Sequence, residues 1–313
     1  MKKIALAIHG GAGPDSEYIR QNIDGYRKGL ESAMDEGYSI LEKGGSAVEA
    51  IEASIRMLED NPHFNAGKGS ALTEKGEVEM CASIMDGKNQ NAGAAAIVKG
   101  VRNPIRLARA IMQKSRYTYL GESGALEFAK LMKLPLEPSA YFITEHQYEE
   151  YEKAKKELHG DAVGTAKDKL SQDKAKKHGT VGAVALDADG NIAAGTSTGG
   201  LEFCKMGRIA DSSMIGVGTY ANNKICAVST TGEGEFHIRH VTAFHIAALI
   251  EYKGMSLREA AYYLVHEKCK DVKADMGLIG VDAQGNLVAE FNTERMHRAL
   301  RSSDQDLIIQ IYP

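Results

Sequence analysis

The 313-residue sequence lacks several features that would place it in a large class of proteins. No apolar run reaches 18 residues, so we expect no membrane span. The four cysteines are widely spaced and never form Cys-x-x-Cys, which argues against a zinc site or a disulfide framework. A net charge of −4 gives no electrostatic reason to expect nucleic acid or an anionic membrane as a partner. The apolar stretch at residues 4–8 is too short for a signal peptide, so we expect a reduced, cytoplasmic protein.

Common nucleotide-binding and serine-hydrolase motifs are also missing. The glycine-rich loop at residues 9–14 fails as a dinucleotide motif, because Ser16 stands where the third glycine is needed. Residues 67–70 are not a phosphate loop, because Gly69 interrupts the required Gly-Lys-Ser/Thr run. Gly-x-Ser-x-Gly is absent. We therefore expect the glycines to let the backbone turn sharply or approach another segment.

Hydrophobic periodicity predicts a mixed chain in which strands lie where the two halves adjoin and helices lie outside. That arrangement favours two stacked sheets covered by helices. One helix start is well marked, because Ser46 and Glu49 form a capping-box pattern. The predicted strands are 3–8, 78–85, 92–98, the two strands of a hairpin within 178–200 whose turn is 188–191, 214–217, 225–230, 276–281 and 287–291. The predicted helices are 22–41, 47–60, 104–114, 123–132, 237–252 and 257–265.

A charged segment separates the halves. Of the 29 residues from 149 to 177, 15 are Asp, Glu, Lys or Arg. Its first ten residues can form a helix through closely spaced Glu and Lys. The remainder, about residues 159–179, cannot bury enough apolar surface to offset the entropy of ordering and is expected to be a flexible linker. It ends directly before Thr180.

Thr180 stands at the start of the hairpin, after Gly179. In an arbitrary chain such a hydroxyl is usually structural. If the backbone were cut between these two residues, Thr180 would carry a free α-amine with a pKa of about 7.7. That amine could activate its own hydroxyl, so one residue would supply both nucleophile and base.

Other polar positions have both structural and functional interpretations. Arg208 and Asp211 could be a surface ion pair or could grip the carboxylate and the ammonium of an amino acid. Thr231 and Gly232 could present a hydroxyl and an N–H to an oxyanion. Asn65 could be a turn residue or a polar group beside a site. His237 and His240 are expected to be structural, because no carboxylate partner is evident.

Taken in order, several motifs resemble the plant-type L-asparaginase/isoaspartyl aminopeptidase family of N-terminal nucleophile hydrolases. They are residues 8–13, 64–67, 85–87, 179–185, 196–200, 207–208, 211–212, 231–232 and 291–293. The resemblance implies an α+β fold, a four-layer αββα sandwich, formed by one domain over 1–313. It also implies self-cleavage of an inactive precursor into an α chain, 1–179, and a β chain, 180–313. Two such αβ heterodimers would associate.

The resemblance also implies a role for individual residues. Thr180 would be the nucleophile, and Thr198 would tune it. The oxyanion hole would be Thr231 and Gly232, with Asn65 supporting the nucleophile region. The substrate would contact Arg208, Asp211 and the Gly234 backbone. No catalytic cofactor is expected, but a structural sodium ion would be held by the backbone carbonyls of Leu58, Glu59, Asn61, Phe64, Ala66 and Lys68.

The activity implied is hydrolysis of small molecules, β-aspartyl dipeptides and L-asparagine, through a β-aspartyl ester on Thr180. The alternatives are a glycosylasparaginase-like hydrolase and a non-catalytic amino-acid-binding homologue. The sequence departs from the family pattern at residues 201–205, Ala210, Ser213 and Glu233. These departures put substrate preference in doubt more than activity.

Overall fold

Two sheets form the framework of the protein, for which the computed structural model describes residues 3–160, 179–268, 270 and 274–313. The larger sheet has the order β12-β11-β1-β5-β6-β2-β3-β4, and the smaller has the order β10-β9-β8-β7. All neighbouring strands are antiparallel except β3 and β4. The larger sheet comprises β1 (Ala5–Gly13), β2 (Met80–Asp86), β3 (Ala92–Val98), β4 (Tyr119–Gly121), β5 (Val181–Leu186), β6 (Ile192–Thr198), β11 (Arg295–Ser302) and β12 (Gln305–Gln310). The smaller comprises β7 (Thr219–Asn222), β8 (Cys226–Gly232), β9 (Met276–Asp282) and β10 (Leu287–Phe291).

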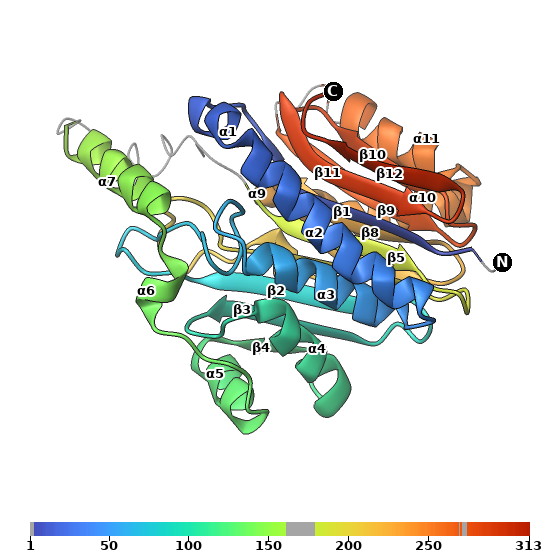
Figure 1. The fold of residues 1–313 in the computed structure, drawn as a ribbon, viewed down its shortest axis with the longest axis horizontal. Helices are drawn as coiled ribbons and strands as arrows, with labels where there is room; N and C mark the ends of the chain where they lie inside the picture. Colours follow the sequence, from blue (N-terminus) through green and yellow to red (C-terminus); the bar gives the residue numbers. More distant parts are fainter. Residues whose placement is uncertain (1–2, 161–178, 269, 271–273) are drawn as a thin grey trace.

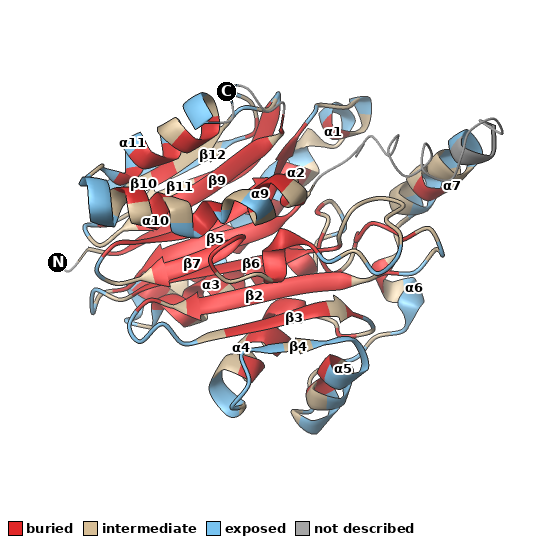
Figure 2. Ribbon diagram, turned by 180° about the vertical axis from the view of Figure 1, so that it is seen from behind, coloured by how far each residue is buried: buried red, intermediate tan, exposed pale blue. Residues whose placement is uncertain are grey.

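Helices lie outside the sheets. The helices α2 and α3 lie in front of the larger sheet in Figure 1. In Figure 2, which shows the opposite side, α9, α10 and α11 lie nearest to the viewer. The first half contains α1 (Glu17–Gln21), α2 (Ile23–Glu42), α3 (Ala47–Glu59), α4 (Pro104–Lys114), α5 (Glu122–Leu131), α6 (Ser139–Phe142) and α7 (Glu145–Gly160). The second contains the 3₁₀ turn η1 (Asp211–Ser213), α9 (Gly234–His240), α10 (Thr242–Lys253), α11 (Leu257–Tyr262) and the π-helical η2 (Tyr263–Lys268).

Strand β1 shows how the larger sheet is buried on both faces. Leu6 and Ile8 belong to the apolar core formed with α2 and α3. Ala5 and Ala7 point to the opposite face and belong to the core shared with the smaller sheet and α10. Because successive side chains of a strand alternate between faces, one strand contributes to two cores. Figure 2 shows this burial along the central strands.

Several predicted elements are confirmed. The strands β3 and β10 and the helix α4 have the predicted bounds. The helix α3 begins after Ser46, whose hydroxyl accepts the Glu49 N–H in a full capping box. The charged segment begins with α7, whereas most of the expected linker lies outside the described residues.

Other predictions were wrong. The predicted helix 237–252 is broken into α9 and α10, because Val241 adopts a left-handed conformation with φ of 49°. The predicted strand 214–217 is a turn, and the strand β7 follows it. The strands β11 and β12 were not predicted.

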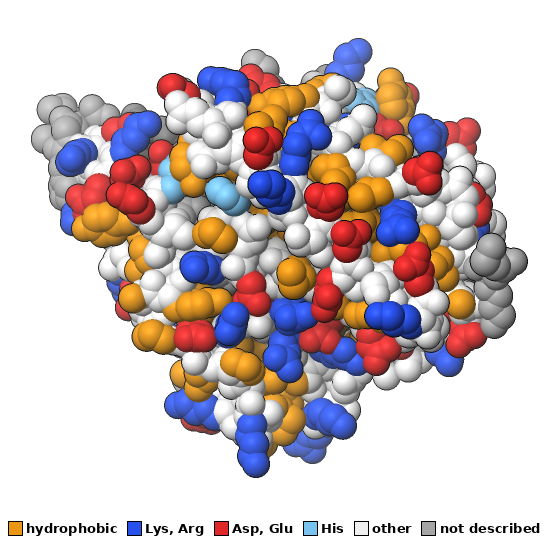
Figure 3. All heavy atoms as spheres, in the orientation of Figure 1, with side chains coloured by type: hydrophobic (Ala, Val, Ile, Leu, Met, Phe, Trp, Pro, Cys, Tyr) orange, Lys and Arg blue, Asp and Glu red, His pale blue; other side chains and the backbone are white. Residues whose placement is uncertain are grey.

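The surface is mixed in charge. In the face drawn in Figure 3, acidic and basic side chains alternate without a large area of one sign. Within the described ranges, no helix is long and apolar enough to cross a membrane.

Candidate active site

Thr180 and Thr198 lie side by side at one end of the β5–β6 hairpin. Val181 pairs with Ser197, so the residue before β5 faces the last residue of β6. The Thr180 Oγ1 donates to Thr198 Oγ1 over 3.3 Å, and both side chains are buried. The larger sheet therefore brings together the predicted nucleophile and the residue predicted to tune it.

The Gly179 carbonyl accepts two hydrogen bonds from neutral side chains. Asn65 Nδ2 donates to it over 2.9 Å, and Thr198 Oγ1 donates over 3.0 Å. Asn65 is itself held in place, because Nδ2 also donates to the Gly200 carbonyl and Oδ1 accepts the Ala71 N–H, each over 2.8 Å. Two donors on one carbonyl polarise it towards nucleophilic attack.

Glycines allow the backbone segments to converge here. A Cβ on Gly11, whose φ is 104°, would lie 3.1 Å from Gly179 Cα and 3.3 Å from the Thr180 nitrogen. A Cβ on Gly199 would lie 2.4 Å from Asn65 Oδ1. These glycines thus allow close approach, as predicted, although residues 9–13 continue strand β1 and do not form the predicted loop. Gly179 itself has no positive φ, but a Cβ there would lie 2.9 Å from Asn65 Cβ, so it also serves close approach.

Thr231 and Gly232, the predicted oxyanion pair, end β8 in the smaller sheet. The Ala12 N–H donates to Thr231 Oγ1 over 3.3 Å, which leaves the Thr231 hydroxyl proton available for another acceptor. Since Gly11 approaches Thr180 and the next residue contacts Thr231, the end of β1 connects the two threonines. His237 Nε2 lies 3.1 Å from the Thr231 carbonyl oxygen, so this histidine contacts the backbone at the end of β8.

Arg208 and Asp211 converge on Gly234. A Cβ on Gly234 would lie 2.7 Å from Asp211 Oδ1 and 2.8 Å from Arg208 Nη2. Asp211 Oδ2 accepts the Thr230 hydroxyl over 3.1 Å. Asp211 is buried, and the ion pair that Arg208 forms is with Glu235, through bonds of 2.8 Å from Nε and from Nη2. Their interpretation as a surface ion pair was therefore wrong.

A chain of buried polar groups joins the two sheets beside Thr180. His9 Nε2 lies 2.9 Å from Ser229 Oγ, which lies 2.7 Å from Thr196 Oγ1. The Thr219 hydroxyl donates to Thr196 over 2.6 Å, and Ser83 donates to Thr219 over 2.8 Å. Burial lowers the pKa of His9 to about 3, although its interaction with the Thr180 backbone opposes that shift. The His9 ring is therefore neutral at physiological pH.

The end of α3 and the loop after it carry the backbone carbonyls of the predicted sodium set, and the Glu59 carbonyl among them accepts the Lys68 N–H over 2.7 Å. A Cβ on Gly67 would lie 2.3 Å from the Glu59 carbonyl oxygen, and a Cβ on Gly69 would lie 2.8 Å from that of Phe64. Two carbonyls of the predicted sodium set thus face positions that lack side chains. Carbonyl oxygen is a ligand type that hard cations prefer. In the part of the chain that the structure describes, no group of three or more His, Cys, Asp or Glu side chains could hold a metal ion.

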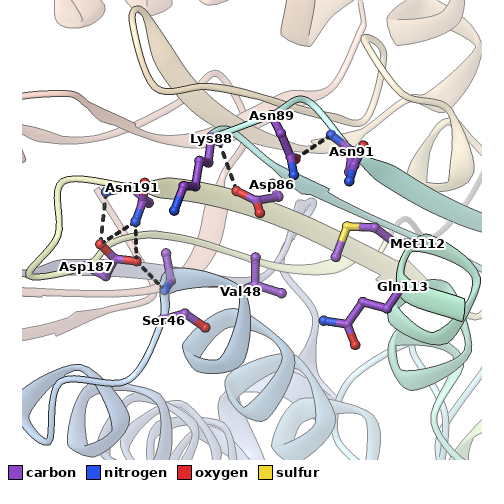
Figure 4. A pocket seen from close by; sticks show the side chains of 11 residues that line it. Ser46, Val48, Asp86, Lys88, Asn89, Asn91, Met112, Gln113, Asp187 and Asn191 are labelled. Atoms are coloured by element: carbon purple, nitrogen blue, oxygen red, sulfur yellow. Dashed lines mark hydrogen bonds between the residues drawn. The ribbon is translucent and has the colours of Figure 1, made fainter.

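A polar pocket at the other end of the hairpin has a structural explanation (Figure 4). Asp187 lies in its wall, where it accepts the Ala47 N–H over 3.1 Å and the Asn191 N–H over 2.9 Å. These contacts fix the β5–β6 turn against the start of α3. The strand β5 separates this pocket from Thr180.

Three contacts in the candidate site were missed from the sequence. Glu235 pairs with Arg208, the Ala12 N–H contacts Thr231, and His9 approaches Thr180. His9 and Ala12 lie at the end of β1, and the glycines around them were the available signal. Glu235 follows Gly234, but nothing in local spacing connects it with Arg208.

Comparison with known proteins identifies the family of the chain. The family model Asparaginase_2, described as Asparaginase, matches residues 2–310. The Isoaspartyl peptidase of Escherichia coli strain K12 is 41% identical over 302 residues, covering 96% of this chain and 93% of that protein. The human Isoaspartyl peptidase/L-asparaginase is 42% identical over 300 residues, covering 95% and 92%. The Arabidopsis thaliana Probable isoaspartyl peptidase/L-asparaginase 2 is 39% identical over 323 residues, covering 98% of each. The chain therefore belongs to the Asparaginase_2 family.

Proposed function

We propose that this protein is a self-cleaving amidohydrolase that acts on β-aspartyl dipeptides and L-asparagine. The relatives named above supply the activity class, and the polar groups around Thr180 supply a mechanism. The observation that carries the proposal is the path from the Thr180 hydroxyl to Thr198 and on to the Gly179 carbonyl. This path supports the proposal because the Thr180 hydroxyl, the Thr198 hydroxyl that accepts from it and the Gly179 carbonyl are neighbouring groups.

In the cleavage step, Thr180 Oγ1 attacks the Gly179 carbonyl carbon. Asn65 and Thr198 donate to the carbonyl oxygen as it gains negative charge. The hydroxyl proton is transferred to the Thr180 nitrogen as the peptide bond breaks, which leaves an ester between the two residues. Water then hydrolyses the ester, giving a Gly179 carboxylate and a free Thr180 α-amine.

In the hydrolysis step, the new α-amine takes the Thr180 hydroxyl proton, directly or through water. The hydroxyl attacks the side-chain amide of the bound aspartyl group, and the leaving amine receives the proton. The Thr231 hydroxyl and the Gly232 N–H stabilise the oxyanion. Arg208 binds the α-carboxylate and Asp211 the α-ammonium, so one clamp serves both substrate types. Water then releases aspartate from Thr180.

The wider architecture follows from the same proposal. The two sheets and their outer helices form one four-layer αββα domain of the N-terminal nucleophile hydrolase type. Cleavage gives chains 1–179 and 180–313, and two αβ heterodimers associate. The carbonyls of the loop after α3 would hold a sodium ion that stabilises the segment carrying Asn65.

Intact-mass analysis beside the Thr180→Ala variant tests the proposal. We expect the wild-type protein to split into fragments of residues 1–179 and 180–313 and then to release aspartate from both substrates. Thr180→Ala should stay whole and inactive. A wild type that remains whole for days at neutral pH contradicts the mechanism, and if it then bound aspartate it would be an amino-acid-binding homologue. Faster turnover of a glycosyl-asparagine than of a β-aspartyl dipeptide would contradict the substrate assignment.

A further inference from the structure

Glu235 contacts Arg208 of the proposed substrate clamp through two hydrogen bonds, although it is not itself one of the groups proposed to bind the substrate. It is the second residue of α9, and its two carboxylate oxygens accept from Arg208 Nε and Nη2, each over 2.8 Å. Paired, parallel bonds of this kind fix the plane of a guanidinium as well as its position. The Arg208 side chain is 18% exposed and that of Glu235 is 44% exposed, so the pair holds a mostly buried cation from its solvent side.

The pair with Glu235 leaves a second edge of the guanidinium available. A guanidinium has five N–H groups in a fixed fork. Glu235 takes one on Nε and one on Nη2, which leaves two on Nη1 and one on Nη2. Nη2 is also the Arg208 atom that would lie 2.8 Å from a Cβ on Gly234, and Asp211 Oδ1 would lie 2.7 Å from the same Cβ. The Nη1–Nη2 edge can therefore bind a second carboxylate close to Asp211.

Glu235 also sets the charge of the clamp. Arg208 contributes one positive charge, and Asp211 and Glu235 each contribute a negative charge. Burial disfavours the charged Arg208, but the hydrogen bonds and the attraction of Glu235, together with the attraction of Asp211, outweigh it and raise the pKa of the guanidinium. Because Glu235 already neutralises the charge of Arg208, we expect the clamp to bind most tightly a ligand that carries both a carboxylate and an ammonium group.

We propose that Glu235 is a positioning residue that fixes Arg208 by its Nε–Nη2 edge, presents the other edge to the α-carboxylate, and makes the clamp selective for substrates that carry an α-ammonium group. This inference rests on the proposed function, since it takes Arg208 to be the group that binds the α-carboxylate. Glu235 acts through Arg208 on binding and takes no part in bond cleavage.

Steady-state kinetics of the cleaved Glu235→Gln enzyme tests the positioning role. The glutamine keeps the shape of the side chain but loses its charge and one acceptor. We expect KM for L-asparagine and for a β-aspartyl dipeptide to rise about tenfold, the inhibition constant of L-aspartate to rise with it, and kcat per cleaved enzyme to change less than about twofold. Glu251→Gln, the same change on the exposed face of α10, should leave all three unchanged.

Succinamic acid, which is asparagine without its α-ammonium, tests the charge role. The ratio of kcat/KM for L-asparagine to that for succinamic acid should fall about tenfold in Glu235→Gln. It should change little in Glu235→Asp, which keeps the charge but shortens the side chain and should still raise KM. Glu235→Asp also provides a measurement if Glu235→Gln does not fold.

The outcomes separate this inference from the proposed function. Wild-type protein without turnover contradicts the proposed function. Active wild type with an unchanged or lower KM in Glu235→Gln contradicts only the positioning role, because Glu235 would then be a spectator or a group that the substrate displaces. A fall in kcat at constant KM would also overturn it, since the residue would then affect the chemistry or the amount of intact site.

Discussion

The polar groups around Gly179 differ in kind from those around Gly234. The Gly179 carbonyl is held by an amide and a hydroxyl, which come from the loop after α3 and the end of β6. The Gly234 region has ionised partners, which come from η1, the loop before it and α9. Neutral donors suit a carbonyl that belongs to the chain itself and is attacked once. A charged fork beside a carboxylate suits an amino acid that must be captured from solvent at every turnover.

The difference suggests that self-cleavage and hydrolysis share Thr180 but use different stabilising groups. Asn65 contacts the scissile carbonyl, whereas Thr231 belongs to the other sheet and contacts Ala12 at the end of β1. Single substitutions should therefore affect one activity more than the other.

Asn65→Asp should have the largest selective effect. The aspartate keeps an acceptor for the Ala71 N–H but loses both donations, to Gly179 and to Gly200. Loss of one donor to a developing oxyanion typically costs about 10²–10³ in rate. We expect cleavage, followed by intact mass over time, to slow by about that factor.

A control for charge is Asn89→Asp in the exposed β2–β3 turn, which makes the same chemical change away from Gly179. It should cleave at the wild-type rate. Cleavage of Asn65→Asp at the wild-type rate would show that the amide does not stabilise the transition state.

Thr231→Val should produce the converse pattern. Valine keeps the branched shape and removes the hydroxyl, so we expect kcat for L-asparagine to fall about 10²-fold. Cleavage should proceed within a few-fold of the wild-type rate, because the donors to Gly179 are intact. Cleavage and turnover are both measured on the same preparation.

Thr242→Val is the matched control for this change. It removes a buried hydroxyl for which the described residues provide no hydrogen-bond partner. It should leave both rates unchanged. Equal slowing of cleavage and hydrolysis in Thr231→Val would mean that one oxyanion site serves both reactions. It would contradict the inference that the two reactions use different stabilising groups.

Local signals in the sequence predicted much of the fold. The helix α3 follows from its capping box, α4 from Pro104 at its first position, and the β5–β6 hairpin from the Asp-Gly turn between apolar runs. The strand β11 was missed because it carries three arginines and a histidine, and Arg295, His297 and Arg298 are buried through tertiary contacts. The break at Val241 was missed because no glycine or proline marks it.

The candidate site could be predicted as a set of residues but not as a network. The resemblance named Thr180, Thr198 and Asn65, and the structure brings them together around Gly179. The pair between Arg208 and Glu235 joins residues 27 positions apart, and the contact of His9 with Ser229 spans 220 positions. Such contacts depend on how the sheets stack, and no local periodicity encodes that stacking.

The His9 ring links the two sheets, because His9 belongs to β1 of the larger sheet and its Nε2 lies 2.9 Å from Ser229 Oγ in the smaller one. Burial lowers the pKa of His9 from 6.5 to about 3 in the folded protein. Below pH 6.5 the unfolded chain therefore binds a proton that the folded protein does not. The stabilisation is complete above pH 6.5 and is lost as the pH falls towards 3, at about 1.4 kcal/mol per pH unit.

The His9→Gln substitution should remove that pH dependence, and urea unfolding of uncut Thr180→Ala protein at pH 7 and pH 5 measures it. We expect the parent to lose about 2 kcal/mol more than His9→Gln between these values. Ser229→Ala, which removes a partner of the ring but keeps the titrating group, should lose stability at both pH values and retain the parent's pH dependence. If parent and His9→Gln lost equal stability, His9 would be protonated or solvated in the fold, and the buried link between the two sheets would carry water or charge in place of a neutral ring.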